Sequence, residues 1–240
     1  METKGSIEPC AISVIVPVYR EEELINKALD RILNFPDKGA GEIIISDGHP
    51  EATTINAIEE EHRNHPKVVT VRSAKGRGTQ MNTAAGYARG NVLLFLHADT
   101  LMDQTAWILL HRLCAVGTDR LCGAFDLEID HGRKVFRIIE KVASLRSRIT
   151  RLPYGDQGIF INREFFNRMS GYPDWPLMED VELMRKIRRE HVRPVIFRHA
   201  VKTSARRWER RGVIHATIRN WILVLLFFAG VSPHRLAKFY

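Results

Sequence analysis

The sequence predicts an α/β protein with a mostly parallel sheet, helices on both faces of that sheet, and a less regular, mixed half behind it. Over the first hundred residues, short apolar runs alternate with segments of helical period, and short connections join them. The runs are apolar at both odd and even positions, which is typical of strands buried on both faces. Right-handed crossovers between such strands place helices on both sides of a parallel sheet.

The first half reads as four strands separated by three helices. Residues 12–19 (ISVIVPVY) are rich in β-branched side chains and predict the first strand. Residues 21–34 carry apolar side chains at helical spacing, and glutamates stand at their N-terminal end, where the helix dipole favours them. The other expected elements are strands at 42–46, at 68–72 and from 92, and helices at 52–63 and 79–88.

The stretch VLLFLHADT at residues 92–100 is the centre of the predicted site. Its apolar run ends at His97, Ala98 and Asp99, and ligands of open parallel sheets bind beyond the carboxyl ends of the strands. A carboxylate there suits a hard divalent cation, with a phosphorylated substrate supplying further ligands. The alternative is that Asp99 only caps the helix that begins near Asp103.

Beyond residue 103 the pattern is mixed. We expect a helix at 104–116, an alternating strand at 122–129 and a basic helix at 134–150, followed by the segment PYGDQGIFI. A turn rich in Trp and Pro leads to a helix at 179–189, a strand at 192–197 and a C-terminal helix.

A single domain is expected over residues 1–240. The division that fits the pattern is a nucleotide-binding half at about 1–100 and an acceptor and catalytic half at about 101–208. A C-terminal apolar helix occupies about 209–240.

The composition favours anionic partners. The net charge is +8 and the pI is about 9.6, which suits phosphates, nucleic acid or an anionic membrane surface. Cys10, Cys114 and Cys122 show no CxxC spacing, which argues against a zinc site and a disulfide scaffold. The N-terminus lacks the apolar core of a secretory signal, so we expect a cytoplasmic protein.

Polar residues follow the second and third predicted strands. Asp47, next to Gly48, could accept hydrogen bonds from a base or ribose, or it could simply form an Asp-Gly turn. Lys75, Arg77 and Gln80 stand at a strand-to-helix junction, where backbone donors and basic side chains favour an anion. The alternative for these three is a solvated polar loop.

Two later clusters also admit two interpretations. Glu179 and Asp180 open a helix, either as ordinary N-terminal acids or as a general base for an acceptor hydroxyl. Arg206 and Arg207, beside Trp208, either grip a diphosphate or form a surface basic patch. Upstream of them, His199 is either a metal ligand or a structural histidine.

Taken in order, these segments resemble family 2 glycosyltransferases of the GT-A fold over nearly the whole chain. The resemblance rests on SVIVPVYREEELI, Asp47-Gly48, KGRGTQMNTAA, FLHADT, GDQGIF and MEDVEL. The subgroup it resembles most is a bacterial one associated with radical-SAM and selenocysteine-related genes, which carries GRGxQMN, FLHADT and TSxRRWE motifs. The family implies a Rossmann-like sheet and inverting transfer of a hexose from a nucleotide sugar, with UDP the expected nucleotide, to a hydroxyl acceptor.

The resemblance also implies roles for single residues. Asp99 matches the last acid of the DxD motif and would hold Mn²⁺ or Mg²⁺ on the donor diphosphate, with His199 as a second ligand. Asp180 matches the catalytic base, and Glu179 precedes it. Asp47 matches the carboxylate that contacts the uracil or ribose. The expected donor-binding residues are Pro17, Tyr19, Glu21, Asp47, Lys75, Arg77, Gln80, His97, Asp156, Gln157, Arg206, Arg207 and Trp208.

The sequence departs from the family pattern at two places. His97 replaces the usual first acid of the DxD motif, so Asp99 is the one carboxylate that the motif supplies to a metal. SDGHPEA stands where the family has DDGSxD, which affects nucleotide selectivity.

Three other functions compete with the transferase. FLHADT loosely matches a phosphohydrolase DxDxT motif, but His97 occupies the place of the nucleophilic acid. A sugar-nucleotide pyrophosphorylase needs a glycine-rich basic loop after its first strand, and PVYREEE is acidic. A nucleic-acid or membrane-surface binding protein fits the charge, but no recognised nucleic-acid motif accompanies it, so no nucleic-acid partner is expected.

The C-terminal stretch NWILVLLFFAGVSPHRLAKFY also has two interpretations. It is too short for a membrane span and ends at Gly230, with Pro233 beyond, which favours a core helix. The alternative is an apolar flap that rests on the inner face of a membrane, which would suit a lipid-linked acceptor.

Overall fold

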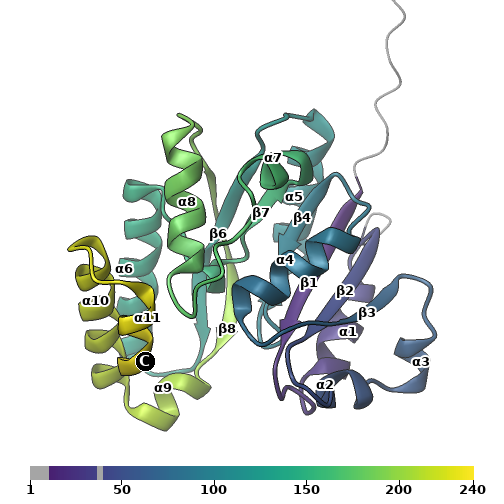
Figure 1. Cartoon of the computed structure of the whole chain (residues 1–240), viewed down its shortest axis with the longest axis horizontal. Helices are drawn as coiled ribbons and strands as arrows, with labels where there is room; N and C mark the ends of the chain where they lie inside the picture. Colours follow the sequence, from purple (N-terminus) through teal and green to yellow (C-terminus); the bar gives the residue numbers. More distant parts are fainter. Residues whose placement is uncertain (1–10, 37–39) are drawn as a thin grey trace, which may run out of the picture.

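Eight strands form one sheet in the order β3-β2-β1-β4-β7-β6-β8-β5 (Figure 1). The computed structural model describes residues 11–36 and 40–240, apart from the side chains of Arg207, Arg210 and Arg211. The first four strands in sequence pair in parallel, which confirms the predicted parallel half. They are β1 (Ile12–Val18), β2 (Glu42–Asp47), β3 (Val68–Arg72) and β4 (Val92–Phe95).

The other four strands make the sheet mixed, as predicted. Strand β7 lies antiparallel between β4 and β6, β6 pairs in parallel with β8, and the short β5 pairs antiparallel with β8. These strands are β5 (Leu101–Met102), β6 (Cys122–Asp130), β7 (Phe160–Asn162) and β8 (Val195–Ser204).

Helices cover both faces of the sheet because adjacent residues of one strand point into different cores. Val14 and Val16 of β1 pack with α1 (Ile25–Leu33) and α5 (Gln104–Val116). Ile15, between them, packs in the opposite core. That core contains side chains of α4 (Arg77–Tyr87), α7 (Arg163–Arg168) and α8 (Glu179–Arg189).

A third group of helices gathers at the end of the molecule opposite β3 (Figure 1). It comprises α6 (Lys134–Thr150), α10 (Val213–Phe228) and α11 (Pro233–Leu236), with α9 (Arg206–Arg211) below them. Single turns of 3₁₀ helix, η1 (Gly155–Gln157) and η2 (Ala237–Phe239), complete the elements of this half.

The expectation of one helix over residues 52–63 is wrong. Two short helices, α2 (Thr53–Asn56) and α3 (Glu60–Arg63), occupy this segment. Asn26 of α1 explains the break, since its side chain donates to the carbonyl of Ala57 and accepts from the amide of Glu59. Backbone groups that a continuous helix would pair internally are therefore bonded to a neighbouring helix.

Strand β8 also differs from its prediction at 192–197. It begins after Pro194, which has no N–H to give to a ladder, and it continues to Ser204 because β6 pairs with it as far as Asp130. The TSARRWE motif is thus the end of a strand followed by the first turns of α9.

Candidate active site

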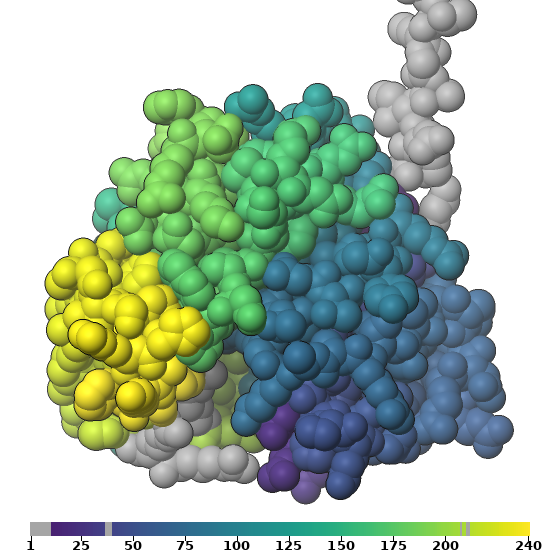
Figure 2. Space-filling view, viewed as in Figure 1, coloured from purple at the N-terminus to yellow at the C-terminus, as the bar shows by residue number. Residues whose placement is uncertain are grey.

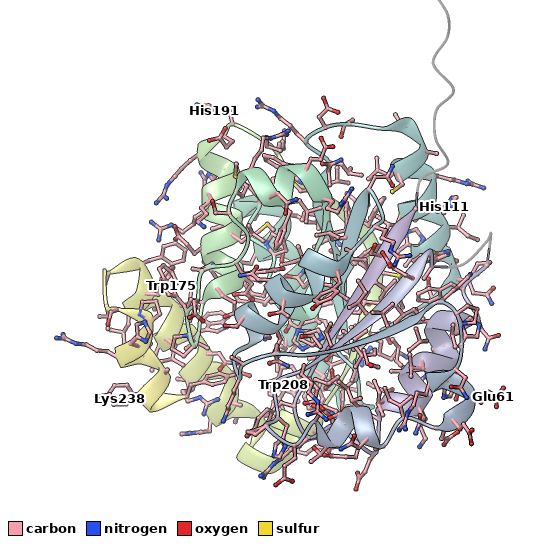
Figure 3. The ribbon with its side chains drawn as sticks, turned by 45° about the vertical axis from the view of Figure 1, so that its right-hand side comes forward. Glu61, His111, Trp175, His191, Trp208 and Lys238 are labelled. Carbon is pink, nitrogen blue, oxygen red and sulfur yellow. The ribbon has the colours of Figure 1, made fainter. Side chains whose placement is uncertain are left out.

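A cavity of about 210 Å³ opens beyond the carboxyl ends of β1 and β4. Its walls come from segments far apart in the sequence, including the starts of α4, α8 and α9. Trp208 of α9, labelled in Figure 3, is one of its lining residues. Of the residues expected at the donor and catalytic sites, the lining includes Pro17, Glu21, Arg77, His97, Asp99, Asp156, Asp180 and Trp208.

Asp180 is held in place at the N-terminus of α8. The amide of Gly155 donates to its Oδ2 at 2.6 Å, and the amide of Val181 donates to its Oδ1 at 2.8 Å. The Nη2 atom of Arg77 lies 3.8 Å from Oδ2. The residue is 6% exposed, so a substrate group in the cavity would meet a carboxylate with a fixed orientation.

Arg77 forms ion pairs with both Glu179 and Asp180. Its Nε donates to Oε1 of Glu179, which is 1% exposed. Burial raises the pKa of Glu179, and the charge of Arg77 opposes that rise. Burial acts to lower the pKa of Arg77, but Glu179 and Asp180 outweigh it and raise that pKa, so the guanidinium stays charged.

Arg206 lies between two carboxylates that line another side of the cavity. Its Nη2 is 3.2 Å from Oε2 of Glu21 and 3.5 Å from Oδ2 of Asp99. Burial raises the pKa of Glu21, Arg206 opposes this, and Asp99 adds to it. The positively charged guanidinium of Arg206 therefore lies between the two carboxylates at the place where the sequence predicts a metal ion.

Asp99 and Glu21 are the residues that could hold a divalent metal here. Their carboxylate oxygens suit Mn²⁺ or Mg²⁺. Within residues 11–36 and 40–240, no group of three or more His, Cys, Asp or Glu side chains is arranged to hold a metal ion. The protein's share of such a site is small, so phosphate oxygens and water would have to complete it.

A ring cluster lies beyond the ends of β1, β2 and β3. The Nζ of Lys75 is 4.6 Å from the ring centroid of Tyr19, and the rings of Tyr19 and His49 are 5.4 Å apart. Tyr19 and Lys75 were expected at a donor site, whereas His49 was not. The feature of the sequence that indicates a role for His49 is its position directly after Asp47-Gly48 in SDGHPEA.

Three of the residues predicted at the donor site form hydrogen bonds with backbone groups and do not line the cavity. Asp47 is fully buried and accepts from the amides of His49, Thr54 and Ile55, so it caps α2. Gln80 donates to the carbonyls of Val18 and Ser46. Gln157 accepts from the amide of Tyr154 and donates to the carbonyl of Phe125.

One of the predicted metal ligands, His199, is not brought to the cavity. His199 is exposed and is not among the residues that line the cavity. It lies at an irregularity of β8, between Phe197, which pairs with Phe125 of β6, and Ala200, which pairs with Asp126. The side chain of Arg207 lies outside the described residues. Cys10 also lies outside them, and Cys122 is a buried free thiol.

The C-terminal helices supply cavity residues that no motif indicated. Asn220, Leu223 and Val224 of α10 line the cavity, as does Tyr240. Leu223 also packs with Leu177 and with Leu236 of α11. These contacts join segments with no shared motif, and the apolar pattern of α10 gave no sign of which neighbour it would meet.

Comparison with known proteins gives one family over most of the chain. A family model described as glycosyl transferase family 2 matches residues 13–174. A poly(ribitol-phosphate) beta-glucosyltransferase of Bacillus spizizenii is 28% identical over 99 residues, which are 40% of this chain and 16% of that protein. A dolichyl-phosphate beta-glucosyltransferase of Drosophila melanogaster is 34% identical over 110 residues, 41% of this chain and 33% of that protein. The chain thus spans a third or less of these relatives.

Solved structures share the fold. A mannosyltransferase from Pyrobaculum calidifontis, in complex with GDP-Man and Mn²⁺, has a TM-score of 0.62 and 22% identity and covers 81% of this chain and 56% of its own. TarS 1–349 of S. aureus, in complex with UDP-GlcNAc, has a TM-score of 0.61 and 19% identity, and the match covers 81% of this chain and 58% of the TarS chain. At these identities the likeness concerns the fold alone.

Proposed function

The chain belongs to glycosyl transferase family 2 and has the GT-A fold, and from this premise we propose that it transfers a hexose from a nucleotide sugar to an acceptor hydroxyl. The observation that supports the proposal most is that Asp99 and Asp180, 81 positions apart, line the same cavity. One carboxylate would serve the donor diphosphate and the other the acceptor.

The donor end of the cavity combines Asp99, Glu21 and Arg206. Asp99 would hold Mn²⁺ or Mg²⁺, which offsets negative charge on the departing nucleoside diphosphate when bound. Arg206 would exchange its carboxylate partners for phosphate oxygens, because a guanidinium matches phosphate in geometry and charge. The same residue would then stabilise the leaving group.

The acceptor end is built around Asp180. As the acceptor oxygen attacks the anomeric carbon, its proton passes to the carboxylate of Asp180, and the bond from that carbon to the phosphate oxygen breaks with inversion. Proton transfer of this kind contributes a factor of about 10²–10⁴ in rate. Gly155 and Arg77 fix the carboxylate, and we assign the buried Glu179 to holding Arg77 instead of to contact with substrate.

The nucleotide and the acceptor are finer proposals. GDP-Man and UDP-GlcNAc are named for two proteins of this fold, so the fold leaves the base open. We propose a UDP donor, with Tyr19, His49 and Lys75 next to the base. The name of the Drosophila relative includes a lipid phosphate, and on this ground we propose a lipid-linked acceptor for this chain as well.

A ligand screen tests the donor assignment. Melting temperatures are measured with UDP, GDP and their sugars, with and without Mn²⁺. A ligand at about 100 times its Kd stabilises by about 2.7 kcal/mol, which is roughly 5–10 °C for this chain length. We expect one nucleotide series to raise the melting temperature further with Mn²⁺, and Asp99→Asn to remove that increment. No shift with any nucleotide would contradict the proposal.

A further inference from the structure

Helix α6 leaves an apolar stripe in solvent. Its exposed apolar side chains recur at intervals of four, three and four residues, which is one face of a helix. They are between 39% and 72% exposed, although α6 buries its opposite side against β6 through Phe136. The stripe consists of Ile138, Val142, Leu145 and Ile149.

Helix α10 has an even larger stripe. It buries Val213, Ala216, Leu223 and Phe227 and leaves most of its remaining apolar side chains 39% to 72% exposed. Those exposed residues are Ile214, Ile218, Trp221, Ile222, Leu225, Leu226 and Phe228.

The two helices are neighbours. Phe136 and Ile139 of α6 share a small core with Val213 and Ala216 of α10, and both helices lie at the same edge of the molecule (Figure 1). The C-terminal helices form a continuous outer surface there (Figure 2). In the part of the chain that the structure describes, all but five exposed large apolar side chains belong to α6 or α10; the exceptions are Tyr87, Val116, Val195, Phe239 and Tyr240.

The charges of α6 and of residues 213–240 are mostly positive, although Glu128 of β6 pairs with Arg137 of α6. Residues 213–240 contain no Asp or Glu. The one acid of α6, Glu140, is buried and accepts a hydrogen bond from the amide of Ile129. Exposed bases flank the stripes, and they are Lys134, Arg137, Lys141, Arg235 and Lys238.

We propose that the stripes of α6 and α10 together form a face that binds the surface of an anionic lipid membrane. Apolar side chains flanked by Lys and Arg are the chemistry of an interfacial helix, which lies in the headgroup region with its apolar side inward. Among the described residues no helix is long and apolar enough to cross a membrane, so the contact is interfacial. A second copy of the chain is disfavoured, because pairing two such faces brings like charges together.

The face lies next to the cavity. Asn220, Leu223 and Val224 line the cavity from the other side of α10, so the thickness of one helix, about 10 Å, separates the cavity from the proposed membrane face. One consequence rests on the proposed function: an acceptor carried by a membrane lipid would have its hydroxyl close to the cavity.

Vesicle binding tests the face directly. The purified chain is sedimented with vesicles of phosphatidylcholine alone and of phosphatidylcholine mixed with phosphatidylglycerol. We expect binding to the anionic vesicles that weakens at high salt. The double variants Ile138→Glu/Ile149→Glu and Ile218→Glu/Leu225→Glu should each lower the partition coefficient by about tenfold or more, since each loses two apolar insertions.

A matched control uses exposed apolar residues outside the face. Tyr87→Glu/Val116→Glu adds the same charge and should keep binding within about threefold of wild type, because only long-range repulsion changes. An equal loss in this control, or full binding by either double variant, would overturn the two-helix face. A stable dimer that the same variants dissociate would overturn it in favour of a second copy.

The tryptophan fluorescence of the wild-type chain tests the same face and does not depend on whether the double variants fold. Trp221 is 59% exposed, so anionic vesicles should shift the wild-type emission to shorter wavelength, and Trp221→Phe should remove most of the shift. No shift would count against the face. Nucleotide-induced melting shifts on the same preparations keep a failure of membrane binding distinct from a failure of the transferase assignment.

Discussion

The amide nitrogen of Gly155 lies 2.6 Å from Oδ2 of Asp180 and donates a hydrogen bond to it. A Cβ atom added to Gly155 would lie 3.3 Å from the same oxygen and 3.6 Å from Nε2 of His97. Gly155 of η1 thus meets the carboxylate so closely that a side chain at this position would require a small shift of Asp180. This contact joins η1 to the start of α8 at the proposed centre of the reaction.

Gly155→Ala should impair catalysis more than folding. The added methyl group would push Asp180 aside by a few tenths of an ångström, and misplacement of about 1 Å can cost about 10²-fold in rate. We expect kcat to fall by about tenfold and the melting temperature to change little. Gly86→Ala, whose Cβ would meet no atom within 4 Å, is the matched control and should keep full activity. Equal kcat values for the two variants would refute the tight contact.

Arg77→Gln should destabilise the fold, because it leaves Glu179 buried without its ionic partner. Breaking a buried pair from one side costs about 3–5 kcal/mol. The free energy of unfolding, measured by urea titration, should recover much of this loss in Arg77→Gln/Glu179→Gln. Arg112→Gln, at an exposed position of α5, should cost no more than about 0.5 kcal/mol. Additive losses in the double variant would show that the pair does not couple.

Glu179 should make stability fall as pH rises from its ordinary pKa of 4.5 towards its raised native pKa. In that window the native protein keeps a proton that the unfolded chain has released, so the unfolded state binds fewer protons and the free energy of unfolding decreases with pH. Urea titrations at several pH values should give a shallower decrease for Glu179→Gln than for wild type. Identical slopes would mean that burial does not raise this pKa.

Leu236→Ala should lower both the free energy of unfolding and kcat. Leu236 is fully buried with Met178 and Val181, which flank the two acids at the start of α8. A buried Leu→Ala change costs about 2–5 kcal/mol, and loosening this cluster should also lower kcat. Leu225→Ala, on the exposed side of α10, should stay within about 0.5 kcal/mol of wild type. A similar small loss at both positions would contradict the packing role of α11.

The sequence predicted the fold well where periodicity is strong. The parallel strands and α1, α5, α6 and α8 carry clear patterns, whereas β5, β7 and α7 are too short to show one. The break between α2 and α3 depends on Asn26, a residue about 30 positions away, which no local pattern reveals.

The candidate site was predicted in part for a similar reason. Asp99 follows a strand and Asp180 begins a helix, which are positions where catalytic and ligand-binding residues are expected, and both residues line one cavity. Tyr240 lines the cavity through contacts between distant segments and carries no local signal. Gly155 belongs to the GDQGIF motif, but the motif did not reveal its contact with Asp180. Polar residues such as Asp47 and Gln80 look the same in sequence whether they bind a ligand or the backbone.

Asp180→Asn tests the central claim most directly. Donor affinity, measured by titration calorimetry with Mn²⁺, is compared with nucleoside diphosphate release in the presence of an acceptor. If Asp180 takes the proton, turnover should fall by about 10²-fold or more, while the Kd for the donor stays within about threefold of wild type. Equal losses of donor binding and turnover, or unchanged turnover, would contradict its assignment as the base.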